Sequence, residues 1–354
     1  WDMKTLPTTF DILIDGSLRL AAQHWQALGV RVQADRPPEA IVDPEALLWL
    51  TLEVGRHEPR LFDEALDWLV ANREWIALPR LRALGPAPDD ERWAALGAAA
   101  AHIVRRAGDA RWQRLAKKPG GDPLLARAVP FFLQRDGKGL TVPEQTDPLF
   151  RAKGFARSVF ERSERSAAPP LTERTSLLLL RATALFGAEA RAYAWAALLH
   201  RPDGALLSEL AEHTGFTRQT VANSLSSFLR SGICVEERRR TAKHYRLRAR
   251  EEWRDILNLR RFPVWPHWPG LFEPLIRLIR TERTSIQGGA SDYIATSALR
   301  REFIAVKDDL VRCGIRVSLP EPDLHLVDAF RDAFNEYFRV LLETALFLPG
   351  PGSP

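Results

Sequence analysis

Two short amphipathic segments joined by a glycine-centred turn, residues 206–214 and 217–230, constrain the fold of this chain more than any other feature. The apolar residues of the first segment form one short face: Leu206, Leu207, Leu210 and Ala211. Gly215 follows them, and glycine reaches the positive φ at which helices commonly end. The apolar residues of the second segment fall at i, i+4, i+7 and i+8: Val221, Leu225, Phe228 and Leu229. This spacing predicts two helices that pack around a tight turn.

The residues after this pair of helices predict a hairpin with a basic tip. Thr217 can cap the second helix with its hydroxyl group, and Ser231-Gly232 ends that helix. Residues 233–235 and 244–247 have the pattern of strands, and residues 238–243 between them are mostly basic. The predicted order is therefore helix, turn, helix, strand, basic tip, strand.

The positive charge of the chain is concentrated in residues 217–250, although the formal net charge is only +5. This segment holds two acidic residues, Glu236 and Glu237, against nine basic ones, a balance of 9 − 2 = +7: Arg218, Arg230, Arg238, Arg239, Arg240, Lys243, Arg246, Arg248 and Arg250. The other 320 residues therefore sum to 5 − 7 = −2. Clustered positive charge favours a partner that carries phosphate groups, although a solvated basic face has the same composition.

The same segment resembles the winged helix-turn-helix domain of bacterial regulators of the arsenic-repressor and multiple-antibiotic-resistance types. The residues that carry the resemblance are Leu210-Ala211, Gly215, the T-x-x-T-V-x-x-x-L pattern of Thr217–Leu225, Leu229, Ser231–Ile233 and Tyr245-Arg246-Leu247. The similarity covers about residues 190–250 and no other part of the chain. It implies a transcriptional regulator that binds double-stranded DNA and acts as a homodimer.

The resemblance also implies which side chains contact DNA. The second helix would enter the major groove, where Arg can bind guanine and Gln or Asn can bind adenine with two hydrogen bonds. Its candidate DNA-binding residues are Thr217, Arg218, Gln219, Thr220, Asn223, Ser224, Ser227 and Arg230. The hairpin, or wing, would follow the phosphate backbone and read few bases. Its candidates are Arg238, Arg239, Arg240, Lys243, His244 and Arg246.

The rest of the sequence predicts a mainly α-helical protein of three parts. Residues 1–162 form a helical N-terminal domain of unassigned role, residues 174–260 contain the winged helix-turn-helix, and residues 261–354 form a C-terminal helical region. The sequence leaves open whether the N-terminal domain binds a small-molecule or protein effector. Ser163–Pro170 is the predicted linker. Helices are expected within residues 10–30, from Pro44 behind an Asp43 cap, and over residues 61–72, 89–115, 177–199, 297–313 and 324–348, with a flexible stretch at 281–291.

Two apolar features outside the basic segment concern the core and the dimer. Seven of the eleven Trp residues precede the predicted linker, and we expect most of the six that follow Trp1 in the core: Trp25, Trp49, Trp68, Trp75, Trp93 and Trp112. The last predicted helix carries an apolar stripe: Leu326, Phe330, Ala333, Phe334, Tyr337, Leu341 and Leu342. This stripe either joins two copies of the chain or packs within its own domain.

The sequence holds no arrangement typical of a catalytic or metal site. It has no phosphate-loop pattern, no G-x-S-x-G and no H-E-x-x-H, and its eight His residues show no ligand spacing. Gly16-Ser17 resembles the start of a nucleotidyltransferase site, but Asp35 and Asp43 are too far apart to supply the acidic pair of that site. We therefore predict no enzymatic activity, no cofactor and no metal.

Composition limits the location of the protein. Two Cys residues, Cys234 and Cys313, cannot form a disulfide framework, which fits a reducing cytosol. The longest nearly uncharged apolar stretch, Trp93–Val104, is too short to span a bilayer. We expect a cytoplasmic protein with no membrane partner. Two alternatives remain: a protein-interaction module, such as an antitoxin or assembly subunit that uses the winged helix as a scaffold, and a nucleic-acid-processing protein whose winged helix only positions its substrate.

Overall fold

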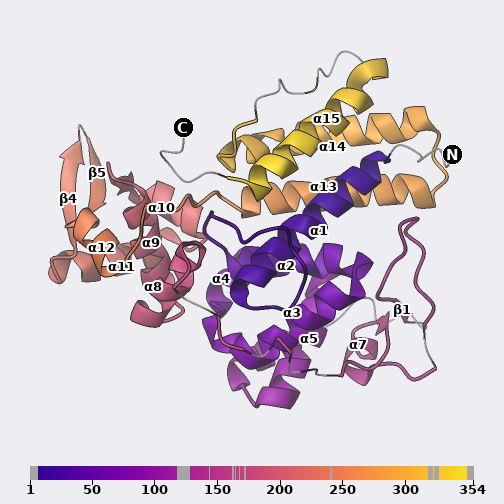
Figure 1. Cartoon of the computed structure of the whole chain (residues 1–354), viewed down its shortest axis with the longest axis horizontal. Helices are drawn as coiled ribbons and strands as arrows, with labels where there is room; N and C mark the ends of the chain where they lie inside the picture. The colour runs from indigo at the N-terminus through magenta and orange to yellow at the C-terminus, as the bar shows by residue number, and fades with distance from the viewer. Residues whose placement is uncertain are drawn as a thin grey trace.

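The computed structural model describes residues 7–117, 128–142, 144–161, 163, 165–166, 168–170, 173–239, 241–317, 322 and 327–348. It is mainly α-helical, as predicted (Figure 1). The helices are α1 (Thr9–Leu28), α2 (Pro44–Val54), α3 (Pro59–Asn72), α4 (Leu78–Ala83), α5 (Arg92–Ala107), α6 (Gln113–Ala116), α7 (Pro148–Arg151), α8 (Leu178–Phe186), α9 (Ala190–His200), α10 (Leu207–Thr214), α11 (Arg218–Arg230), α12 (Arg250–Ile256), α13 (Pro269–Gln287), α14 (Asp292–Arg312) and α15 (Val327–Leu346). The strands are β1 (Val129–Pro130), β2 (Phe155–Ala156), β3 (Ala205–Leu206), β4 (Cys234–Arg239) and β5 (Ala242–Leu247). None of the described helices has the length and apolar composition needed to cross a membrane.

Helices from both ends of the chain build one helical body. Helix α1 packs against α2, and also against α13 and α15 from the C-terminal region (Figure 1). The predicted N-terminal and C-terminal regions therefore share one core. Helices α8–α12 and strands β3–β5 form a lobe beside this body, which we call the α8–α12 lobe.

Local signals start several helices where the sequence predicts. The Asp43 carboxylate accepts a hydrogen bond from the backbone N–H of Ala46 at 3.1 Å, and Pro44 occupies the first turn of α2. Thr8 caps α1 in the same way and forms a capping box with Asp11. The helices predicted within residues 10–30, from Pro44 and over residues 61–72 are confirmed.

Three of the predicted segments differ from the structure: two predicted helices are each split in two, and one predicted flexible stretch is largely helical. The helix expected over residues 89–115 is split at Gly108, which adopts φ +67° between α5 and α6. The helix expected over residues 177–199 is split at Gly187, with φ +81°, between α8 and α9. The flexible stretch expected at residues 281–291 is largely helical, because α13 continues through Gln287. Apolar residues continue on both sides of Gly187, so composition does not reveal the break between α8 and α9.

The apolar stripe of the last helix lies inside the helical body, so its interpretation as a dimer seam is wrong. Its buried members are Phe330, Phe334, Tyr337, Leu341 and Leu342, whereas Ala333 is exposed and Leu326 lies outside the described residues. The Phe334 ring lies 5.7 Å from that of Phe303 in α14. A Cβ on Gly16 of α1 would lie only 2.5 Å from Leu342 Cδ1. Gly16 therefore serves the close approach of α1 to α15.

Tryptophan side chains fill much of the core, as predicted. Of the six Trp residues expected in the core, Trp75 is half-buried and the other five are buried: Trp25, Trp49, Trp68, Trp93 and Trp112. The rings of Trp25 and Trp68 meet edge to face with centroids 5.5 Å apart. Their indole N–H groups donate hydrogen bonds to Thr51 Oγ1 at 2.8 Å and to the Leu28 carbonyl at 2.9 Å.

The described residues of the predicted linker include two that are bonded to the helical body, Ser166 and Ala168. The hydroxyl of Ser166 is fully buried and donates a hydrogen bond to Glu64 Oε2 at 2.6 Å. It also accepts one from the backbone N–H of Arg31 at 2.9 Å. Asn72 in α3 donates to the carbonyl of Ala168 at 3.2 Å. A Ser- and Ala-rich composition therefore marks a segment that is docked, not a free linker.

Acid is expected to destabilise this body through His24. Burial between Trp268 and Phe272 lowers the pKa of His24 to about 3. In the unfolded chain the pKa of His is near 6.5. Between pH 3 and 6.5 the unfolded chain therefore binds more protons than the folded chain, so the free energy of unfolding decreases as the pH falls below about 6.5. When the pH is lowered from 7.5 to 5, we expect protonation of His24 in the unfolded chain to lower the free energy of unfolding by about 2 kcal/mol.

Urea denaturation followed by Trp fluorescence at both pH values measures this loss. His24→Leu removes the titrating ring, so its pH dependence should be shallower than that of the wild type by the same amount. Parallel pH curves for the two proteins would contradict the assignment.

Candidate nucleic-acid interface

The α8–α12 lobe contains the helix pair expected from the sequence. Helix α10 ends at Thr214 and is capped by Gly215, whose φ of +73° is in the left-handed region that favours glycine. The ring of Phe216 fills the turn and lies 5.3 Å from that of Tyr193 in α9. Thr217 caps α11, because its hydroxyl accepts a hydrogen bond from the backbone N–H of Thr220 at 3.2 Å. These residues hold α11 in place from its first turn.

One side of α11 is core and the opposite side is solvent-exposed. Val221, Leu225 and Phe228 are buried, as the spacing predicts, and Leu229 is partly buried. The exposed side presents a polar row: Thr217, Arg218, Gln219, Thr220, Asn223 and Arg230. Gln219 Nε2 donates a hydrogen bond to Asn223 Oδ1 at 3.0 Å. The two amides are therefore already aligned with each other on the exposed surface.

Two serines of the candidate set are turned toward the rest of the protein. Ser224 is buried, and its hydroxyl donates to the Thr220 carbonyl at 3.1 Å. Ser227 is half-buried and donates to the Asn223 carbonyl at 3.2 Å. Their hydroxyl protons are engaged by the helix backbone, which leaves the outer row as the more accessible group.

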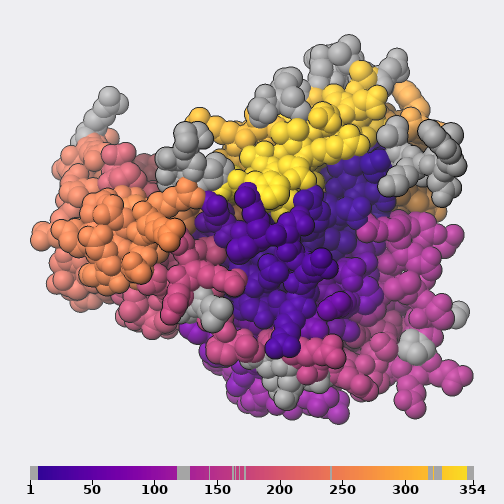
Figure 2. All heavy atoms as spheres, in the orientation of Figure 1, coloured from indigo at the N-terminus to yellow at the C-terminus, as the bar shows by residue number. Residues whose placement is uncertain are grey.

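Strands β3, β5 and β4 form a small antiparallel sheet in that order. In the long β4–β5 hairpin Arg238 lies opposite Lys243 and Arg239 opposite Ala242, so the basic residues gather at the tip. A Cβ on Gly204 would lie 2.5 Å from the Tyr245 carbonyl oxygen, and Gly204 also has a φ of +77°. The close approach of β3 to β5 thus requires glycine. The hairpin stands at the outer end of the lobe (Figure 2).

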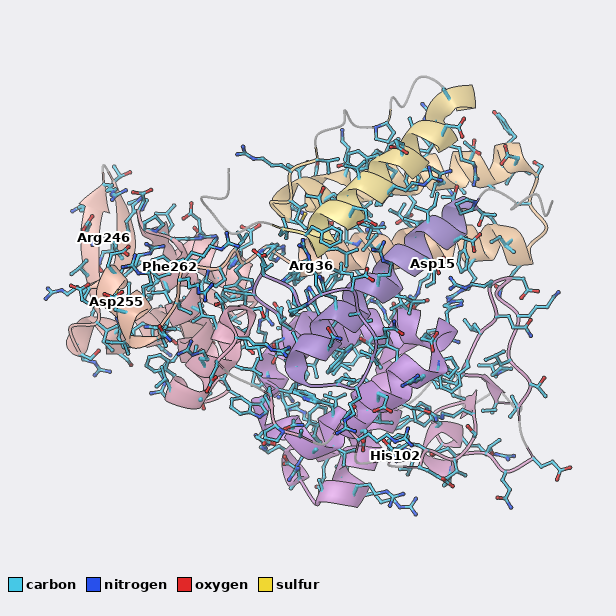
Figure 3. All side chains as sticks on the ribbon, in the orientation of Figure 1. Asp15, Arg36, His102, Arg246, Asp255 and Phe262 are labelled. Atoms are coloured by element: carbon cyan, nitrogen blue, oxygen red, sulfur yellow. The ribbon has the colours of Figure 1, made fainter. Side chains whose placement is uncertain are left out.

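Acidic residues of the hairpin neutralise part of its positive charge. Lys243 Nζ lies 2.9 Å from Glu236. Arg246, which Figure 3 labels on the hairpin, lies 2.8 Å from Glu237. Arg239 lies 3.5 Å from the same Glu237 carboxylate. His244 is half-buried on β5, and Arg240 lies outside the described residues.

The basic residues of the 217–250 segment therefore differ in availability. Within the described part of the chain, four exposed ones are in no ion pair: Arg218, Arg230, Arg238 and Arg248. Arg250 is held internally, since its Nε donates to the Leu199 carbonyl at 2.7 Å and its guanidinium lies 3.4 Å from the Phe262 ring centroid. Among the hairpin arginines that the structure describes, Arg238 is exposed and in no ion pair, whereas Arg239 and Arg246 are paired with Glu237.

A fully buried ion-pair network joins the lobe to the helical body. Arg80 of α4 donates to both carboxylate oxygens of Asp43, at 2.5 and 2.6 Å, and to Glu45 at 2.8 Å. Its Nε donates to the carbonyl of Thr214, the last residue of α10, at 2.5 Å. The Tyr193 hydroxyl of α9 donates to Glu45 at 2.8 Å, and its ring lies 4.7 Å from the Arg80 guanidinium.

Burial and charge act in opposite directions within this network. Burial raises the pKa of Glu45 and raises that of Tyr193 well above its ordinary value. Burial opposes the charge of Arg80, but Asp43 and Glu45 outweigh it and raise the pKa of Arg80. Arg80 therefore stays charged, and both carboxylates depend on it for compensation. No sequence pattern pairs Arg80 with residues 37 and 134 positions away.

The helical body also borders α11 directly. A cavity of about 400 Å³ lies between Pro79 and Ala83 of α4, Arg191 of α9, and Thr220 and Ser227 of α11. The exposed row of α11 is thus flanked by α4 along its inner edge.

The two thiols are poorly ionised, and the described acidic residues do not gather as metal ligands. Cys234 and Cys313 are both buried, and burial raises the pKa of each thiol to about 11. Among the described residues no three His, Cys, Asp or Glu side chains come together as a metal site would require.

Comparisons of the chain with protein-family models, with curated proteins and with solved structures give no match.

Proposed function

We propose that this protein is a sequence-specific double-stranded DNA-binding protein, a cytoplasmic transcriptional regulator whose α8–α12 lobe is a winged helix-turn-helix. The observation that carries the proposal is the polar, exposed side of α11 beside a hairpin with a basic tip. An α-helix with its side chains is about 10–12 Å wide and fits a major groove of about 12 Å. Gln219 and Asn223 would read bases, and Arg238 would contact a phosphate.

Fluorescence anisotropy with two labelled duplexes tests the proposal. One duplex carries the region upstream of the protein's own gene, the other a scrambled sequence of equal length, and both are titrated at several salt concentrations. We expect tighter binding to the upstream duplex at salt where the scrambled one is released. Equal, salt-sensitive binding to both duplexes would support DNA binding but contradict regulation of the protein's own gene. If folded protein binds neither duplex, the proposal fails and the protein-interaction module becomes the better reading.

Arg238→Ala should weaken binding to both duplexes alike. Arg238 is exposed at the hairpin tip, and loss of one phosphate contact lowers the slope of log K against log salt by about 0.9. Arg339→Ala on α15, another exposed arginine, is the matched control and should leave the slope unchanged. An unchanged slope for Arg238→Ala would exclude this residue from the interface.

The homodimer that we propose uses α14 in place of α15. Four large apolar side chains are exposed on α14, 48–71% of their surface being accessible: Tyr293, Ile294, Ile304 and Val311. Arg301 and Asp308 are exposed on the same helix, seven residues apart. An antiparallel pairing that places Arg301 opposite Asp308 of a second copy also places Ile304 opposite the small Ala305. The face is therefore complementary to itself, as a two-fold interface requires.

Charge reversal tests this interface by light scattering coupled to size exclusion. The wild type should run at 2 × 40.0 = 80.0 kDa. Arg301→Asp and Asp308→Arg each place like charges opposite one another, so each should shift the protein toward the monomer. The double variant R301D/D308R restores opposite charges and should recover the dimer. A monomeric wild type, or single variants that remain dimeric, would contradict the pairing.

A further inference from the structure

A second cluster of positive charge lies on the helical body, outside the lobe. Residues 105–117 hold five basic side chains against one acidic one, Asp109, a balance of 5 − 1 = +4: Arg105, Arg106, Arg111, Arg114 and Lys117. All five are exposed. They occupy the end of α5, the loop after Gly108 and the short helix α6. We call these residues the α5–α6 cluster.

The cluster borders a cavity whose charged lining residues are all cations. Arg82 of α4, Arg114 and Lys117 line it together with Trp93 and Leu115, and its volume is about 680 Å³. Three acidic residues close to it in the sequence are paired with other arginines: Asp90 with Arg92 and Arg280, Glu91 with Arg56, and Asp109 with Arg111. Asp89, beside Asp90, is exposed. The cavity therefore presents positive charge that the protein itself does not neutralise with these carboxylates.

Helix α4 holds this cavity in a fixed relation to α11. Arg82 faces the cavity, while its neighbours Pro79 and Ala83 line the other cavity beside α11. The Leu84 side chain sits against Gly215, since a Cβ there would lie 2.8 Å from Leu84 Cδ2. Arg80 in the same helix is bonded to the end of α10. Helix α4 lies between α11 and α5 in Figure 1. Because Arg82 of α4 lines the same cavity as Arg114 and Lys117, a ligand that crosses α4 from α11 would meet these three side chains.

We propose that Arg82, Arg114 and Lys117 form a second contact surface for the phosphate backbone of the duplex that α11 binds. This inference rests on the proposed function and assigns a role to the helical body within it. Guanidinium and ammonium groups bind phosphate without regard to base sequence, so the surface adds affinity and not specificity. It acts only on a duplex long enough to cross α4.

Binding to random-sequence duplexes of 12 and 30 base pairs tests the surface. The variant R82Q/R114Q/K117Q removes three charges from exposed or half-exposed positions and keeps the polar character of the side chains. On the 30-base-pair duplex we expect roughly tenfold weaker binding and a log–log salt slope lower by about 2–3, since each phosphate contact contributes about 0.9. On the 12-base-pair duplex the variant should match the wild type.

Arg60→Gln with Arg339→Gln, two exposed arginines of α3 and α15, is the matched control and should change binding to neither duplex. Equal loss of affinity on both duplexes would overturn the proposal, because the three charges would then contribute to binding of a duplex that is too short to cross α4. Unchanged binding to the long duplex would overturn it as well, while leaving the role of α11 intact. Failure of the wild type to bind either duplex would overturn the proposed function and this surface together.

Discussion

Replacing Arg80 by Met is expected to lower the free energy of unfolding by about 3–5 kcal/mol, the cost of removing one partner of a buried ion pair. Met fills a similar length but carries no charge. Asp43 and Glu45 would remain buried at 1% and 0% exposure without a counter-charge, and the Thr214 carbonyl would lose its donor. Urea denaturation at pH 7.5 measures the loss.

A second variant separates lost charge compensation from lost packing. In the triple variant R80M/D43N/E45Q both uncompensated carboxylates become neutral amides, and Asn still caps a helix. We expect it to recover part of the stability lost by Arg80→Met. Arg82→Met on the same helix is half-exposed and should change stability by no more than about 0.5 kcal/mol. Equal losses for Arg80→Met and Arg82→Met would show that the network does not stabilise the fold.

Local periodicity explains why much of the lobe could be predicted. The buried stripe of α11 follows the helical period, and the left-handed turn at Gly215 needs a residue without a side chain. Both depend on residues only a few positions apart. Asp43 shows the limit of such reasoning, since its cap on α2 is local whereas its pairing with Arg80 depends on the tertiary fold.

Other features could not be predicted because the sequence does not state what covers an apolar surface. The stripe of α15 has the same pattern whether its own chain or a second copy buries it, and α1 proves to be its cover. The Ser163–Pro170 segment has a linker composition, yet Glu64 binds the Ser166 hydroxyl. In the hairpin, the net charge of the sequence overstates the accessible positive charge, because Glu236 and Glu237 form ion pairs with Lys243 and Arg246 of the neighbouring strand.

Substitution of Gln219 or Asn223 by Ala should reduce affinity for the specific duplex by about 1–3 kcal/mol each, the usual worth of a two-bond amide–base contact. Binding to the scrambled duplex should not change, because neither side chain carries charge. Both residues are exposed, and Ala favours the helix, so the fold should stay intact. Gln33→Ala, at an exposed position of the helical body, is the matched control.

The double variant carries the sharper test of base reading. Because Gln219 donates a hydrogen bond to Asn223 at 3.0 Å, each amide helps to orient the other, and the two losses should not add. We therefore expect Q219A/N223A to lose less than the sum of the single variants, by about 0.5 kcal/mol or more in a double-mutant cycle on the specific duplex. Exactly parallel losses on specific and scrambled duplexes would instead mean that α11 supports the lobe without reading bases.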